Sequence, residues 1–186
     1  MRLPPPLIDL VARGVVRQLI ARRVVSSDHP RATEEKVARL IAEDLKVEDA
    51  LNEEARLVLD EHREALRGGE VEYHRLFTRV KSELAAQRGY VLGAGPGKLP
   101  REKVNSLGGA VAVLLLEDPD VEYFVPEPQL RLAVLRALED EMRRDLLREE
   151  KAHQKVRSIR RNIPEESAEF HALFQQFYRD LLDREG

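Results

Sequence analysis

Two stretches of the chain share one pattern of apolar and polar positions. Residues 73–89 and 170–186 each place an aromatic residue before a histidine, followed by Leu-Phe, a bulky apolar residue, Leu and a final Gly. Apolar positions separated by three and four residues are typical of an amphipathic helix. Each stretch therefore predicts one helix that a glycine closes. The matched pairs are Tyr73/Phe170, His74/His171, Leu76/Leu173, Phe77/Phe174, Val80/Phe177, Leu84/Leu181 and Gly89/Gly186.

The rest of the first half predicts two further helices. Prolines at 4–6 fit a first helical turn, where amide groups have no partner, and an apolar stripe continues to about Arg22. Residues 26–30 have turn and capping chemistry. A long helix is then expected over 33–66, because no Gly or Pro interrupts it, and Gly68-Gly69 is expected to end it.

The second half repeats this order. A helix is expected over 104–116, a turn and a short extended segment over 118–125, a long helix over about 128–161, and a last helix that opens at Pro164. The sequence therefore predicts an all-α protein of two tandem three-helix units, each with one long helix. Matched positions in the long helices are Glu43-Asp44/Glu139-Asp140, Asp49/Asp145, Leu51/Leu147 and Glu53-Glu54/Glu149-Glu150.

The segment 93–97 is the predicted boundary, because four of its five residues are Gly or Pro. The expected domains are an N-terminal repeat at 1–92, this linker, and a C-terminal repeat at 98–186. The sequence leaves two arrangements open: either the repeats pack together through their aromatic helices, or they are separate units on a flexible linker. Homodimerisation through the same surface is also open.

Composition narrows the classes of function. Apolar residues make up 42% and charged residues 35%, the net charge is −3, and there is no Cys. Disulfides, Cys-based zinc sites and Cys nucleophiles are excluded, and a reducing cytoplasm is expected. The N-terminus does not follow the signal-peptide pattern, and the longest apolar run, 108–116, is far shorter than the roughly 20 residues of a membrane span. We therefore expect a soluble protein without a membrane partner.

Three segments of the second half carry a family resemblance. They are Leu99-x-Arg101-Glu102-Lys103-Val104-Asn105, the acidic and apolar turn from Glu117 to Phe124, and Ile163-Pro164-Glu165-Glu166-Ser167 before the aromatic helix. With them the chain resembles an uncharacterised bacterial family catalogued as domain of unknown function 507. The resemblance covers nearly all of 98–186 and extends more weakly to 1–92, where Arg67-Gly68-Gly69-Glu70 replaces the last segment. It implies small helical cytoplasmic proteins, with no known catalytic residue, ligand or partner.

Histidines and acids are the candidate metal ligands. His74 and His171 occupy matched places, but neither has a second His three or four residues away, so a boundary position on a helix is favoured. The acids of the long helices alternate with Lys and Arg, which favours a solvated face with ion pairs over a metal cluster. No Glu-x-x-His motif accompanies them. These acids are Glu43, Asp44, Asp49, Glu53, Glu139, Asp140, Asp145 and Glu149, interleaved with Lys46, Arg56, Arg143, Arg144 and Arg148.

The stretch 151–161 is the one concentrated basic segment and the candidate nucleic-acid contact. Cations near the C-terminus of a helix also stabilise its dipole, and no interleaved aromatic residues offer a stacking platform. A second basic face, near the N-terminus, consists of Arg13, Arg17, Arg22 and Arg23. The candidate residues of the stretch are Lys151, Lys155, Arg157, Arg160 and Arg161.

The aromatic stripes are interpreted as structural core. Each buried side chain of this kind contributes about 1.5–3 kcal/mol, which small units need. The second stripe is richer, so truncating Phe174 is expected to cost more than truncating Phe77. The expected core residues are Tyr73, Phe77, Phe170, Phe174, Phe177 and Leu181.

No catalytic motif is present in the sequence. The Gly-rich segment 93–97 lacks the Gly-Lys-Ser/Thr of a phosphate loop, and no Ser-His-Asp order is defensible. We therefore expect a non-enzymatic helical protein, without a cofactor, that acts by protein–protein interaction or as a scaffold. Its partner would be an unknown protein or a second copy. The alternative is a nucleic-acid-associated protein that uses 151–161.

Overall fold

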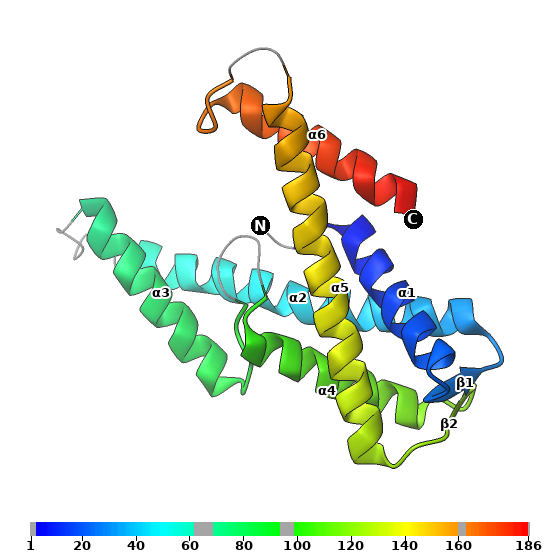
Figure 1. The fold of residues 1–186 in the computed structure, drawn as a ribbon. Coiled ribbons are helices and arrows are strands. Elements are labelled where there is room, and N and C mark those ends of the chain that lie inside the picture. Colours follow the sequence, from blue (N-terminus) through cyan, green and yellow to red (C-terminus); the bar gives the residue numbers. More distant parts are fainter. Residues whose placement is uncertain (1–2, 62–68, 94–98, 160–162, 186) are drawn as a thin grey trace. The chain divides into compact units, whose positions relative to one another are not determined.

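A computed structural model describes residues 3–61, 69–93, 99–159 and 163–185. Over these residues the chain forms six helices and two short strands (Figure 1). The predicted all-α class is confirmed. The elements are α1 (Pro5–Ala21), β1 (Val25–Ser27), α2 (Pro30–Glu61), α3 (Gly69–Gln87), α4 (Arg101–Glu117), β2 (Val121–Tyr123), α5 (Glu127–Arg157) and α6 (Ala168–Glu185).

Internal contacts divide the chain into two compact units. The smaller unit contains Leu40–Leu107, and the larger unit contains Leu3–Arg39 with Gly108–Gly186. The larger unit combines α1 and β1 from the first half of the sequence with β2, α5 and α6 from the second. These units therefore do not coincide with the expected domains 1–92 and 98–186. Of the expected linker only Gly93 is described, and residues 94–97 lie outside the described part.

The strands form one antiparallel pair in the larger unit, with Val25 opposite Tyr123 and Ser27 opposite Val121. The short extended segment expected near 121–125 is confirmed as β2. Its partner β1 begins at Val25 and extends into the region interpreted as a turn, so that interpretation is wrong for Ser26 and Ser27. The β-branched Val25 drives the difference, because it is 2% exposed and packs where a turn residue would face water.

The last helix begins later than expected. Pro164 lies in the preceding turn, and α6 starts at Ala168. The N–H of Phe170 donates to the Ser167 hydroxyl at 3.1 Å, so Ser167 supplies the N-cap. At the other connection, Gly69 starts α3 instead of ending α2, and residues 62–68 lie outside the described part.

Helices α3 and α1 end with the same geometry and different residues. Gly89 has φ 61° and Arg23 has φ 55°. In both cases the following amide donates to the carbonyl five residues earlier, at 2.9 Å, which is the Schellman cap. Glycine adopts this left-handed conformation without steric cost, whereas arginine is strained there.

The core of the larger unit lies where α1 packs against α5 and α6. On α6 the buried side chains are Phe170, Tyr178 and Leu182, whereas the expected core residues Phe174, Phe177 and Leu181 are half-buried. On α3 the expected Tyr73 and Phe77 are half-buried, and Ala85 is buried. No helix in the described ranges is long and apolar enough to cross a membrane.

Candidate functional site

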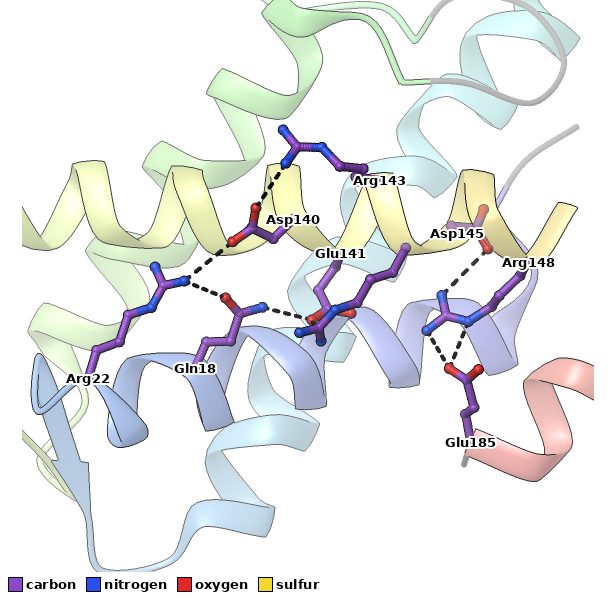
Figure 2. Close-up of polar contacts among 9 residues, drawn as sticks. Gln18, Arg22, Asp140, Glu141, Arg143, Asp145, Arg148 and Glu185 are labelled. Carbon is purple, nitrogen blue, oxygen red and sulfur yellow. Dashed lines mark hydrogen bonds and ion pairs between the residues drawn. The ribbon is translucent and has the colours of Figure 1, made fainter. Parts of the chain in front are cut away.

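Helix α5 buries charge in the middle of the larger unit. Its inward face is apolar at Leu130, Val134 and Leu138, and the same helical spacing then reaches polar residues. Glu141, Asp145 and Arg148 are 2%, 6% and 5% exposed. We call these residues and their partners the polar layer: Gln18, Glu141, Arg144, Asp145, Arg148, Tyr178 and Glu185. Figure 2 labels Gln18, Glu141, Asp145, Arg148 and Glu185 of this layer.

Glu141 lies directly against helix α1. Its Oε1 accepts hydrogen bonds from Gln18 Nε2 at 2.8 Å and from Arg144 at 2.6 Å. A Cβ added at Gly14 would clash with this carboxyl group. The glycine therefore lets α1 approach the acid, and Gln18, one turn further along α1, provides a donor for it (Figure 2).

Asp145 connects α5 with α6. The Tyr178 hydroxyl donates to its Oδ1 at 2.7 Å, and the Arg148 guanidinium lies 3.7 Å from the same oxygen. Burial raises the pKa of the Asp145 carboxyl, although the Tyr178 hydrogen bond and Arg148 oppose the change. Burial, followed by the hydrogen bond to Asp145, raises the pKa of the Tyr178 hydroxyl as well.

Arg148 makes the second connection to α6. Its Nε and NH2 both donate to Glu185 Oε2, at 2.9 and 2.7 Å. The Arg148 side chain is 6% exposed and the Glu185 side chain is 45% exposed, so the pair extends from the core to the surface. Next to the layer, at Gln18, the exposed Arg22 NH2 donates to Gln18 Oε1 at 3.2 Å and to Asp140 Oδ2 at 3.3 Å (Figure 2).

The layer has the residue types of acid–base chemistry, but its groups face one another. A carboxyl with a raised pKa beside a phenol is a combination that active sites use. Here Asp145 and Tyr178 are both buried and bonded to each other, and Glu141 is held by its two donors. The geometry is that of a buried polar network that fixes helix positions.

The smaller unit has its own buried charge. Lys103 is fully buried, and its Nζ lies 2.5 Å from Asp44 Oδ2 and 3.7 Å from the centre of the Tyr90 ring. The Tyr90 hydroxyl donates to the Asp44 carbonyl at 2.8 Å. Burial, with the charge of Asp44, raises the pKa of Tyr90. The buried Lys103 cation thus lies between the half-buried Asp44 carboxylate and the face of the Tyr90 ring, which both stabilise its charge.

A hollow of about 400 Å³ lies between α1 and the first turns of α2. Of its arginines, Arg13 and Arg17 lie 3.9 and 3.5 Å from the Glu34 carboxylate. Three acids match three arginines in the lining, so the hollow has no net charge to attract an anion. The lining residues are Asp9, Arg13, Arg17, Arg31, Glu34, Glu35 and Ala38.

The candidate nucleic-acid contacts are not brought together as one free basic surface. Lys155 lies over the Phe177 ring at 5.0 Å, and Arg157 donates to Glu165 at 2.9 Å. Lys151 is exposed. Arg160 and Arg161 lie outside the described residues.

The candidate metal ligands are dispersed. His74 and His171 are exposed, and His171 Nδ1 lies 2.9 Å from the Ser167 carbonyl oxygen. In the described ranges, no three His, Cys, Asp or Glu side chains could hold a metal ion together. The interpretation of the long-helix charges as a solvated face is wrong for Asp145 and Arg148, because both are buried. The sequence signal for this burial is the spacing of three and four residues that continues from Leu130 to Asp145 and Arg148 on one face of the helix.

The comparison with protein families matches the chain to the family described as protein of unknown function (DUF507), over residues 1–186. The comparison with curated proteins found no match. The matched range includes both halves of the sequence. The chain therefore belongs to the DUF507 family.

Proposed function

We propose that this protein is a non-enzymatic interaction or scaffold protein that binds another protein. The exposure of large apolar side chains on the larger unit is the observation that supports this function. Tyr123-Phe124 and Leu146-Leu147 are consecutive pairs, between 41% and 58% exposed. Exposed apolar side chains of this size provide the apolar contacts that partner surfaces use.

The polar layer supports the same proposal from inside the unit. Charges bonded to one another in a core fix the positions of helices and so hold a surface in one shape. A scaffold needs such a fixed surface, and it needs no reactive group. Absence of Cys supports a cytoplasmic location for this activity.

Affinity capture from native lysate, combined with sedimentation analysis of the purified chain, tests the proposal. We expect a stoichiometric partner or self-association, and we expect Leu146→Ser/Leu147→Ser or Tyr123→Ser/Phe124→Ser to reduce it. Leu57→Ser is the matched control, because Leu57 is 64% exposed on α2 in the smaller unit. A strictly monomeric chain that captures no partner contradicts the proposal.

Nucleic-acid association through 151–161 is the weaker alternative, because Arg157 and Lys155 already have protein partners. Filter binding at low salt decides it. Unchanged affinity after Arg157, Arg160 and Arg161 are replaced by Ala excludes this stretch as the contact.

We also propose that the chain arose by internal duplication. The order of helix, short strand, long helix and helix occurs twice, as α1–β1–α2–α3 and α4–β2–α5–α6. Pairing of β1 with β2 supports mutual dependence of the halves. Fragments 1–92 and 98–186 are expected to be poorly stable alone and to associate when mixed, and two independently stable, non-associating fragments would contradict this.

A further inference from the structure

The side chains of the two strands differ in exposure. On β1, Val25 is 2% exposed and α1 packs against the strand. On β2, Glu122 and Tyr123 are exposed, and Phe124, which follows directly, is 55% exposed. The ladder lies between the end of α1 and the start of α5 (Figure 1). The side chains of β1 are therefore more buried in the unit, whereas those at the end of β2 face solvent.

The hydrogen-bond pattern shows which groups of β2 face outward. Phe124 N–H donates to the Val24 carbonyl at 3.0 Å, and Asp28 N–H donates to the Asp120 carbonyl at 3.2 Å. In an antiparallel pair, residues that exchange these bonds alternate with residues that do not. Tyr123 lies between such positions, so its N–H and C=O point away from β1. They are the groups to which an added strand would bind.

The side chains at this edge suit an extended ligand. Consecutive residues of a strand point to opposite faces, so Tyr123 and Phe124 place one ring on each face of the sheet. An added strand would have an aromatic neighbour on both faces. Cross-strand contacts of aromatic with β-branched or other apolar residues each contribute roughly 0.2–1 kcal/mol, which adds to the main-chain bonds.

The charge around the edge selects the ligand. The segment from Glu117 to Glu127 contains five acids and no Lys or Arg: Glu117, Asp118, Asp120, Glu122 and Glu127. Lys36 binds Asp118 at 2.7 Å and Asp120 at 3.2 Å, and Arg131 binds Glu127 at 2.9 Å. Glu117 and Glu122 are the exposed glutamates that a ligand could contact. A second copy of β2 would bring like charges together at Glu122, which disfavours self-pairing. A segment with cations is complementary.

We propose that the outer edge of β2 binds an extended, basic segment of a partner protein by strand addition. Apolar residues of the segment contact Tyr123 and Phe124, and Lys or Arg residues pair with the exposed glutamates. This inference rests on the proposed interaction function and names the partner chemistry for one of its surfaces. Strand addition is a common route by which exposed sheet edges recognise peptides.

Fluorescence anisotropy with a labelled peptide of alternating Lys and Val tests this on the full-length protein. We expect saturable binding that weakens with salt, no binding of a Glu-Val peptide, and at least about tenfold weaker binding when alternate residues of the Lys-Val peptide are N-methylated. Tyr123→Ser/Phe124→Ser is expected to weaken binding about tenfold and Glu122→Gln about threefold. Leu132→Ser, on α5 and 45% exposed, is the matched control and should change nothing.

Equal binding of the methylated and unmethylated peptides, or unchanged binding to Tyr123→Ser/Phe124→Ser, overturns the inference. Lysate capture then separates it from the proposed function. A partner retained equally by wild type and by Tyr123→Ser/Phe124→Ser keeps the interaction function and refutes this edge as its site. Absence of any partner refutes the function, while the peptide measurement still decides whether the edge binds strands.

Discussion

Helices α2 and α5 have almost the same length, 32 and 31 residues, and they bury different chemistry. The inward residues of α2 include Ile41, Leu45 and Leu51, whereas α5 buries Glu141 and Arg148. The difference depends on what faces each helix. The α5 carboxylate of Glu141 faces Gly14 and Gln18 of α1. Gly14 leaves space for the carboxylate and Gln18 donates a hydrogen bond to it, whereas an apolar neighbour would leave it unpaired.

The comparison also corrects the matching of the two long helices. Leu51 and Leu147 were matched by sequence, but Leu51 is fully buried and Leu147 is 58% exposed. The buried position of α5 is the next residue, Arg148. Apolar character alone therefore does not fix the inward face, because a buried arginine with two carboxylate partners competes with the adjacent leucine.

The largest expected effect comes from Arg148→Ala. It leaves Asp145 and Glu185 without their shared cation, and removing one partner of a buried pair costs about 3–5 kcal/mol. Urea denaturation measures the change in the free energy of unfolding. Arg131→Ala is the matched control, because its pair with Glu127 is exposed and contributes about 0.2–0.5 kcal/mol. Similar losses for both variants would show that the layer contributes no more than a surface ion pair.

Tyr178→Phe should have the next largest effect. The substitution keeps the ring and removes the donor to buried Asp145, which costs about 1–3 kcal/mol. Tyr123→Phe is the matched control, because Tyr123 is 47% exposed, and this variant should unfold like the wild type. Equal stability of all three proteins in urea would mean that the Tyr178 bond contributes nothing.

The two helix caps should respond with opposite signs. Gly89→Ala places a side chain at φ 61° and should lower the free energy of unfolding by about 1 kcal/mol. Arg23→Gly relieves the strain at φ 55° and should raise it by roughly 0.5–1 kcal/mol. Thermal and urea unfolding report both changes. Loss of stability in Arg23→Gly would show that the arginine side chain outweighs the backbone strain.

Two buried acids should oppose each other in the pH dependence of stability. The Lys36 hydrogen bond lowers the pKa of Asp118, so its contribution is present above the ordinary value of 3.8 and is lost as pH falls below it. Burial raises the pKa of Asp145, so its contribution is largest below 3.8 and declines as pH rises through the raised value.

Unfolding measured between pH 7 and pH 3 separates the two acids. Asp118→Asn should flatten the loss of stability on acidification, whereas Asp145→Asn should steepen it. Changes of the same sign in both variants would contradict the assigned environments.

Helical periodicity and capping residues predicted the class and most helices, because these signals are local. The strand β1 was not predicted, because a strand of three residues depends on pairing with its distant partner β2. Burial of Asp145 and Arg148 was missed for a related reason. Charged residues on a helix predict a solvent-exposed face unless their buried partners are known. Here the partners Tyr178 and Glu185 belong to α6, so the sequence of α5 alone does not show them.

A double-mutant cycle on Gly14 and Glu141 tests most directly whether the buried charge of α5 is fitted to α1. Gly14→Ala should lower the free energy of unfolding by about 1–3 kcal/mol in the wild type, because its Cβ clashes with the Glu141 carboxyl. In a Glu141→Ala background the same change should be neutral or stabilising by up to about 1 kcal/mol. Gly109→Ala, where a Cβ meets nothing within 4 Å, is the helical control and should behave alike in both backgrounds. An identical cost of Gly14→Ala with and without the Glu141 carboxylate would contradict the account.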